Sequence, residues 1–129
     1  EGKYPGLVSV NIVFDTILAD KVYEASDFFI VPSRYEPCGL TQMIAMWYGT
    51  LPIVREVGGL KDTVKNGQTG FVFKDYSSAS LAEAVGNALK VYNTPRRAEM
   101  VEKAMACDFS WDKSAKIYKE LYERVISLR

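Results

Sequence analysis

Short apolar runs alternate with amphipathic segments along most of this chain. Four runs are rich in β-branched and aromatic residues and are bounded by Gly, Pro or Asn, a pattern typical of strands; they cover residues 7–14, 28–31, 51–54 and 71–73. Elsewhere apolar residues recur at helical spacing, which predicts helices over about residues 17–25, 40–48, 60–64, 79–91, 96–105 and 111–127. Because strands and helices alternate, we predict an α/β fold with a mainly parallel sheet of about four strands flanked by helices.

Residues suited to helix ends stand at the expected boundaries. Asp15 or Thr16 can cap the first helix, Gly49 follows the second, and Ser110 precedes the last. Pro95 suits the first turn of the fifth helix. No linker, internal repeat or low-complexity stretch interrupts the sequence. We therefore expect a single domain over residues 1–129, with a helical carboxyl-terminal tail over about residues 95–129.

Composition narrows the chemistry that this domain can perform. Its 129 residues, 48% of them hydrophobic, are enough for one ordinary core. Sixteen basic and sixteen acidic side chains cancel without runs of like charge, which argues against a nucleic-acid surface or a polybasic membrane patch. The chain contains no histidine, so no imidazole within it can act as base, nucleophile or metal ligand.

Cysteine use and hydropathy bear on the compartment. Cys38 and Cys107 are the only cysteines and lie far apart, so we expect neither a zinc site nor a disulfide framework. No apolar run is long enough to span a bilayer, and the first residues do not resemble a signal peptide. We therefore expect a cytoplasmic protein without a membrane anchor. The sequence does not begin with Met, so we also expect that it was cut from a longer chain.

The most informative segment joins the second expected strand to the helix after it. Residues 32–41 contain two prolines and a glycine, which end the strand and bend the chain. The carboxyl ends of parallel strands form the edge at which open α/β folds bind ligands. There the backbone amides of Cys38, Gly39 and Leu40 and the hydroxyl of Thr41 would face an anion such as a phosphate. A strand-to-helix turn without a ligand explains the same spacing equally well.

Glu36 is the only acidic residue in this turn. As a functional group it would accept hydrogen bonds from sugar hydroxyls and stabilise positive charge at an anomeric carbon. As a structural group it would cap the unpaired amides beside it. Gly58 and Gly59 follow the next strand, where we expect either a second bare-backbone loop facing the first or a simple turn.

Other polar residues near strand ends suit ordinary structural roles. Asp62 and Lys65 fit solvated helix positions, and Arg34 and Arg55 fit the surface better than a phosphate site. Cys38 lacks a histidine partner, so we do not expect it to act as a nucleophile.

Aromatic residues are assigned mostly to packing. Tyr35 can stack on a ring or a sugar, whereas Trp47 and Tyr48 stand at helical spacing from Met43 and are expected in the core. The last helix carries an apolar stripe that we attribute to ordinary helix packing, formed by Trp111, Ile117, Tyr118, Leu121 and Tyr122.

Several stretches together resemble a known family. They are Val31-Pro-Ser-Arg-Tyr-Glu-Pro-Cys-Gly-Leu-Thr-Gln42, Tyr48-Gly-Thr50, Gly58-Gly-Leu-Lys-Asp-Thr-Val64 and Asn66-Gly-Gln-Thr-Gly-Phe71. The pattern resembles the carboxyl-terminal domain of bacterial glycogen synthases and plant starch synthases, most densely over residues 25–73. It implies a partial Rossmann-like, nucleotide-sugar-binding domain of the GT-B architecture. It also implies retaining transfer of glucose from ADP-glucose or UDP-glucose to the non-reducing end of an α-1,4-glucan, without a metal or other cofactor.

The resemblance implies roles for eight residues. Glu36 would be the catalytic carboxylate, and the donor would be bound by Tyr35, Cys38, Gly39, Leu40, Thr41, Gly58 and Gly59. Many related transferases carry a second glutamate where this sequence has Ile44. The glycogen and starch synthase branch commonly lacks that glutamate, so the difference favours this branch.

The resemblance also implies missing parts: an amino-terminal domain and the first two strands of this one. We therefore expect the segment to contribute to donor binding and to be inactive alone. The unpaired edge at residues 28–31 would be covered by residues 8–14 or by another chain in a swapped or edge-paired dimer. The alternatives are another GT-B transferase, such as a sucrose or trehalose-phosphate synthase, and a non-catalytic nucleotide- or glucan-binding domain. A plant source would place the protein in a plastid.

Overall fold

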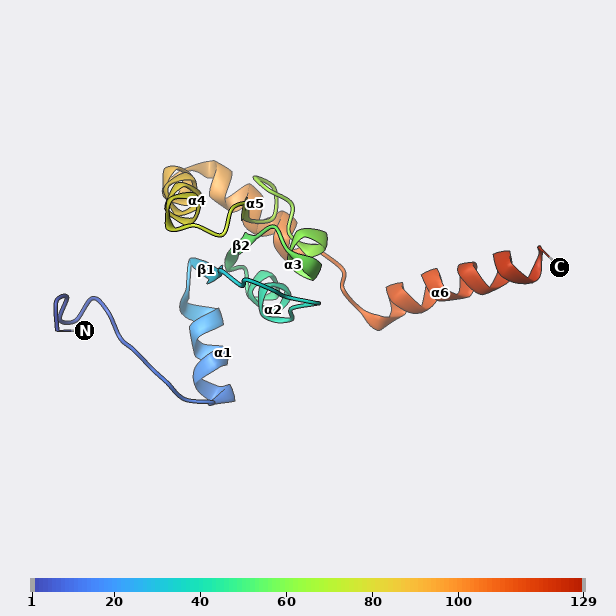
Figure 1. The fold of residues 1–129 in the computed structure, drawn as a ribbon, viewed down its shortest axis with the longest axis horizontal. Helices are drawn as coiled ribbons and strands as arrows, with labels where there is room; N and C mark the ends of the chain where they lie inside the picture. The colour runs from blue at the N-terminus through green and yellow to red at the C-terminus, as the bar shows by residue number, and fades with distance from the viewer. Residues whose placement is uncertain (1, 129) are drawn as a thin grey trace.

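The computed structural model of the protein describes residues 2–128, which form one parallel three-stranded sheet and six helices. In chain order the elements are α1 (Thr16–Ala25), β1 (Phe28–Val31), α2 (Thr41–Trp47), β2 (Leu51–Arg55), α3 (Gly58–Thr63), β3 (Phe71–Phe73), α4 (Ser78–Val91), α5 (Pro95–Met105) and α6 (Trp111–Ile126). The strand order is β1-β2-β3, and Figure 1 shows β1 and β2 with the helices around them. The predicted α/β class and parallel sheet are confirmed, and all six predicted helices form within two residues of their expected ends.

The fourth predicted strand, at residues 7–14, does not form. This segment is extended and exposed, with Phe14 98% accessible to solvent. β-branched residues favour a strand only where a neighbouring strand can take up the backbone hydrogen bonds, and here none is adjacent. Within residues 2–128, β1 is an edge of the sheet, so the expectation that residues 8–14 pair with it is wrong. Pairing with a second chain stays a prediction.

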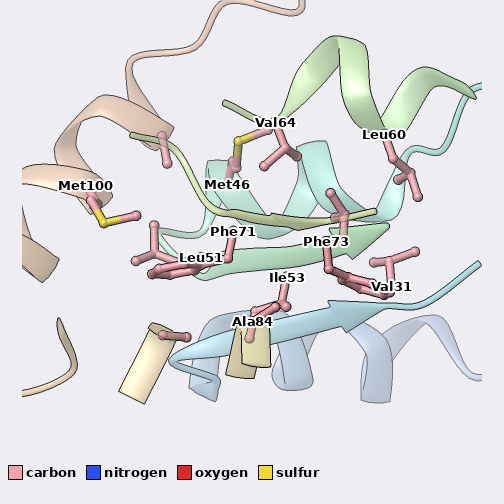
Figure 2. Packing of buried hydrophobic residues seen from close by; sticks show 13 residues of the cluster. Val31, Met46, Leu51, Ile53, Leu60, Val64, Phe71, Phe73, Ala84 and Met100 are labelled. Carbon is pink, nitrogen blue, oxygen red and sulfur yellow. The ribbon is translucent and has the colours of Figure 1, made fainter. Parts of the chain in front are cut away.

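The core lies on both faces of the central strand. In β2, Leu51 and Ile53 point to one face and Pro52 and Val54 to the other, and all four are buried. A strand buried on both faces is typical of a parallel sheet covered by helices. The cluster around it draws side chains from every strand and from four helices (Figure 2): Val31, Met46, Leu51, Ile53, Val54, Leu60, Val64, Phe71, Phe73, Ala84, Ala88, Met100 and Ala104.

Local capping fixes several junctions as the sequence predicts. The Asp15 carboxylate accepts a hydrogen bond from the Leu18 amide at 3.0 Å and begins α1. Gly49 follows α2 with a φ of +82°, which favours glycine. Thr50 then begins the approach to β2: its buried hydroxyl lies 2.6 Å from the Tyr23 carbonyl and 2.7 Å from the Ser26 carbonyl, both of which can accept from it. This hydroxyl ties the amino end of β2 to the end of α1.

Two predictions about aromatic packing are wrong. Trp47 is 74% exposed and Tyr48 is also exposed, rather than buried in the core. Trp47 lines an open apolar groove of about 600 Å³ between α2 and the α5–α6 connection. The stripe of α6 likewise has no cover: no residue of this helix is buried among the described residues, and α6 extends away from the body (Figure 1). Helical spacing identifies an apolar face but does not identify what covers it.

Among residues 2–128, no helix is both long enough and apolar enough to cross a membrane.

Candidate functional site

Two loops meet at the carboxyl edge of the sheet. The first, residues 32–40, leaves β1 and leads into α2. The second, residues 56–59, leaves β2 and includes Gly58 and Gly59, which were expected in a loop or turn and instead form the first turn of α3. Because β1 and β2 are parallel neighbours, with Val31 opposite Val54, their carboxyl ends place both loops side by side.

The backbones of the two loops are in direct contact. The Gly59 amide donates a hydrogen bond to the Glu36 carbonyl at 3.2 Å. A Cβ atom on Gly58 would stand 1.7 Å from the Glu36 carbonyl oxygen, and one on Gly59 would stand 2.1 Å from the Cys38 carbonyl oxygen. Only glycine allows this approach. Four predicted site residues, Glu36, Cys38, Gly58 and Gly59, are thus brought together.

Glu36 is half-buried in the first loop. The Ser33 hydroxyl lies 3.3 Å from its Oε2 atom and donates to it. Gly39 lies against the same side chain: its φ is +76°, and a Cβ there would stand 3.2 Å from Cγ of Glu36. The carboxylate is therefore held by its own turn and remains partly open to solvent.

The backbone amides that follow Glu36 are free. Among the described residues, no hydrogen bond engages the amides of Cys38, Gly39, Leu40 or Thr41. Leu40, at the start of α2, has no side-chain cap. Unpaired donors exposed next to a carboxylate can bind a ligand that carries both an anionic group and hydroxyl groups.

Tyr35 and Cys38 lie on the outside of the first loop. Tyr35 is 77% exposed, so its ring is accessible for stacking. The Cys38 thiol is free and exposed, and it makes only a long contact of 3.9 Å with the Gly39 carbonyl. Neither side chain is fixed by the packing around it.

Sequence reasoning missed Gln42 and Thr63. Nε2 of Gln42 donates to the Gly39 carbonyl at 2.7 Å and to Oγ1 of Thr63 at 3.1 Å. Thr63 in turn donates to the Gly59 carbonyl at 2.8 Å. The only sequence signal is a polar residue, Gln42, immediately before the apolar run from Met43 to Trp47 of α2.

Arg55 was expected at the surface, but it is half-buried and supports the first loop. Its Nη1 atom donates to the Arg34 carbonyl at 2.8 Å, and its guanidinium lies 5.3 Å from the centre of the Tyr76 ring. Arg34, Asp62 and Lys65 are exposed or solvated, as the sequence predicts.

Metal-binding side chains do not gather anywhere in the part of the chain that the structure describes. Residues 2–128 contain no group of three or more Cys, Asp or Glu side chains close enough to bind a metal ion. The polar groups that the first loop offers a ligand are its backbone amides, which donate, and the Glu36 carboxylate, which accepts.

A parallel sheet with two touching loops at its carboxyl edge defines an open α/β domain with the place at which such folds bind ligands. Residues 17–106 match the family described as Glycosyl transferases group 1. The chain belongs to this family.

Individual proteins with similar sequences narrow the assignment within this family. The chain is 49% identical to a glycogen synthase of Thermodesulfovibrio yellowstonii over 130 residues, which is 100% of this chain and 26% of that protein. It is 51% identical to a glycogen synthase of Lactococcus lactis over 95% of this chain and 27% of that protein. The resemblance to glycogen and starch synthases that the sequence motifs indicated is confirmed. The chain spans about a quarter of the length of the curated relatives it matches.

Solved structures give the same picture. The catalytic domain of starch synthase IV from Arabidopsis thaliana, bound to ADP and acarbose, matches with a TM-score of 0.79 and 43% identity, over 89% of this chain and 26% of that one. A sucrose-phosphate synthase from Thermosynechococcus elongatus matches with a TM-score of 0.60 and 31% identity, over 83% of this chain and 27% of that one. Similarity is therefore higher to the starch synthase than to the sucrose-phosphate synthase.

Proposed function

We propose that this chain is the donor-binding part of a retaining glucosyltransferase that transfers glucose from ADP-glucose or UDP-glucose to the non-reducing end of an α-1,4-glucan. The observation that carries the proposal is the half-buried Glu36 carboxylate beside four free amides, within the stretch that matches the family. The relatives' names and the ADP in the starch synthase neighbour support an adenine nucleotide and a glucan.

The proposed chemistry divides between the two kinds of group. The amides of Cys38, Gly39 and Leu40 and the hydroxyl of Thr41 donate to the donor's phosphates, which stabilises the leaving diphosphate without a metal ion. Glu36 accepts hydrogen bonds from the glucosyl hydroxyls and stabilises positive charge at the anomeric carbon during transfer. We assign contact with the base or ribose to Tyr35.

Gly58 and Gly59 have a geometric role in this proposal. Because they have no side chains, the second loop lies directly against the carbonyls of Glu36 and Cys38. We assign acceptor binding and the rest of the donor site to the amino-terminal domain and further strands that the family resemblance implies, because this chain covers only about a quarter of its relatives. For the isolated chain, we also propose a dimer in which β1 pairs with a second chain, either by strand swapping or edge to edge.

Binding is tested with the ¹⁵N-labelled chain and ADP. We expect amide shifts at residues 38–41 and 58–59, and none at residues 66–70 of the opposite edge. Shifts spread evenly over the chain, or none at residues 38–41, would contradict the donor site.

Catalysis is tested in a chimaera in which this chain replaces the matching 130 residues of the Thermodesulfovibrio yellowstonii protein. Glu36→Ala is expected to lower kcat for glucose transfer by about 10²–10³-fold and to change ADP affinity by less than about threefold. Glu24→Ala, at an exposed carboxylate of α1, is the matched control. Equal losses in kcat and in ADP affinity would refute the assigned role of Glu36.

A further inference from the structure

The side chain of Gln42 is completely buried, with 0% of its surface exposed, in the first turn of α2. Its amide can be oriented in only one way. Oγ1 of Thr63 donates its hydrogen to the Gly59 carbonyl at 2.8 Å and therefore accepts from Gln42. The second Nε2 hydrogen goes to the Gly39 carbonyl at 2.7 Å, and a flipped amide would place two oxygens against each other there.

These bonds join the two loops of the candidate site. Gln42 binds Thr63, Thr63 binds the Gly59 carbonyl, and the Gly59 amide binds the Glu36 carbonyl. Together with Gly39, whose carbonyl accepts from Gln42, we call these five residues the Gln42 network. It starts and ends in the first loop, once at Glu36 and once at Gly39, so it fixes both sides of the turn that carries the free amides.

Because the peptide bond is planar, a hydrogen bond to one carbonyl also fixes the direction of the next N–H. In a trans peptide the C=O of one residue and the N–H of the next lie in one plane and point in opposite directions. The bond from Gln42 to the Gly39 carbonyl therefore sets the direction of the Leu40 N–H. Nε2 also lies 3.5 Å from the Cys38 carbonyl and can share with it the hydrogen directed at Gly39, which orients the Gly39 N–H in the same way but more weakly.

Gln42 also carries an unpaired acceptor. Among the described residues its Oε1 atom is buried without a hydrogen-bond partner. A buried acceptor without a partner disfavours folding, and methionine, of similar length, would avoid it. Fold stability alone therefore does not explain a glutamine here, whereas its two donors explain it.

We propose that Gln42 is a positioning residue that orients the Leu40 and Gly39 amides toward the donor's phosphate. The phosphate as ligand rests on the proposed function, whereas the orientation of the amides rests on the geometry alone. The variants are Gln42→Met, which removes both donors, Thr63→Val, which removes the acceptor, and Thr63→Ser, which restores it. Gln68→Met changes the other glutamine of the chain, which is exposed.

The first measurement is of the ligand-free 129-residue chain. Residual dipolar couplings report the direction of each N–H bond. In Gln42→Met we expect the couplings of Gly39 and Leu40 to fall at least twofold through averaging, while those of β2 stay unchanged. Thr63→Val is expected to give a smaller fall that Thr63→Ser reverses. Unchanged couplings at Leu40 in Gln42→Met would overturn the proposal.

The second measurement is ADP affinity from amide shifts. We expect Gln42→Met to weaken binding at least tenfold, Thr63→Val about threefold, and Thr63→Ser and Gln68→Met not at all. Thr50→Val, which removes a buried hydroxyl at the opposite edge, controls for lost stability; an equal loss of affinity there would overturn the positioning role. If ADP does not bind the unaltered chain, the donor proposal and the phosphate role of Gln42 both fail. In that case altered Leu40 couplings in Gln42→Met would still support the part of the proposal in which Gln42 orients the amides. If Gln42→Met does not fold, the Thr63 pair decides by the same two measurements.

Discussion

The close contact between the two loops gives a quantitative prediction for glycine-to-alanine changes. A methyl group on Gly59 would stand 2.1 Å from the Cys38 carbonyl oxygen, where ordinary contact begins near 3.4 Å, so the backbones would have to separate by about 1.3 Å. That movement also breaks the hydrogen bond from the Gly59 amide to the Glu36 carbonyl. We expect Gly59→Ala to lower the free energy of unfolding by about 2–4 kcal/mol, from overpacking together with one lost hydrogen bond.

Three further glycines separate backbone conformation from contact. Gly58 has a φ of +46° and the 1.7 Å approach, so Gly58→Ala is expected to cost about 3–5 kcal/mol. Gly67 has a φ of +69° with nothing within 4 Å, so only the conformational cost of about 1–2 kcal/mol applies. Gly86 lies in α4 with open space around it, so Gly86→Ala is expected to stabilise by about 0.5–1 kcal/mol.

Urea unfolding followed by far-ultraviolet circular dichroism measures all four free energies on the same chain. The predicted order of stability is Gly86→Ala above the unaltered chain, then Gly67→Ala, Gly59→Ala and Gly58→Ala. A Gly59→Ala protein within about 0.5 kcal/mol of the unaltered chain would refute the close approach of the two loops, because surface substitutions fall within that range.

Two other predictions concern regions away from the site. Thr50→Val is expected to lower the free energy of unfolding by about 1–3 kcal/mol, because the carbonyls of Tyr23 and Ser26 lose a buried donor; a change below about 0.5 kcal/mol in the same urea experiment would contradict it. Hydrogen bonds from the hydroxyl and amide of Ser110 lower the pKa of Asp108. At a pH above the usual pKa of aspartate, the charged carboxylate therefore stabilises the start of α6. This stabilisation is lost as the pH falls through the lowered pKa. Ser110→Ala should raise the Asp108 pKa towards its ordinary value in a ¹³C NMR titration, and an unchanged midpoint would exclude the hydroxyl as a cause.

Local patterns predicted the elements of this fold because they are encoded in neighbouring residues. The strands β1, β2 and β3 follow from short apolar runs between Gly and Pro, and the helices from apolar spacing and caps such as Asp15. The strand expected at residues 7–14 failed because strand formation needs a partner that local sequence does not specify. Trp47 failed for a related reason: its spacing marks an apolar face that nothing in the described chain covers.

The same distinction separates the predicted and the missed residues of the site. Glu36 and Gly39 were identified because a Pro/Gly turn between a strand and a helix is visible in a few consecutive residues. Gln42 and Arg55 were missed because their partners, Thr63 and the Arg34 carbonyl, each lie 21 positions away in sequence. Contacts at that separation exist only once the loops have been brought together by the sheet.

The position of α6 determines where the chain can be cut without loss. Every buried hydrophobic side chain in the described residues lies between Tyr23 and Ala104, and residues 108–110, just before α6, are exposed. A protease that cleaves there would release the last helix and leave the sheet with its flanking helices intact, since none of their burial depends on α6. Residues 2–16 are exposed as well, so a product trimmed at both ends would nearly coincide with residues 17–106, the stretch by which this chain matches the family.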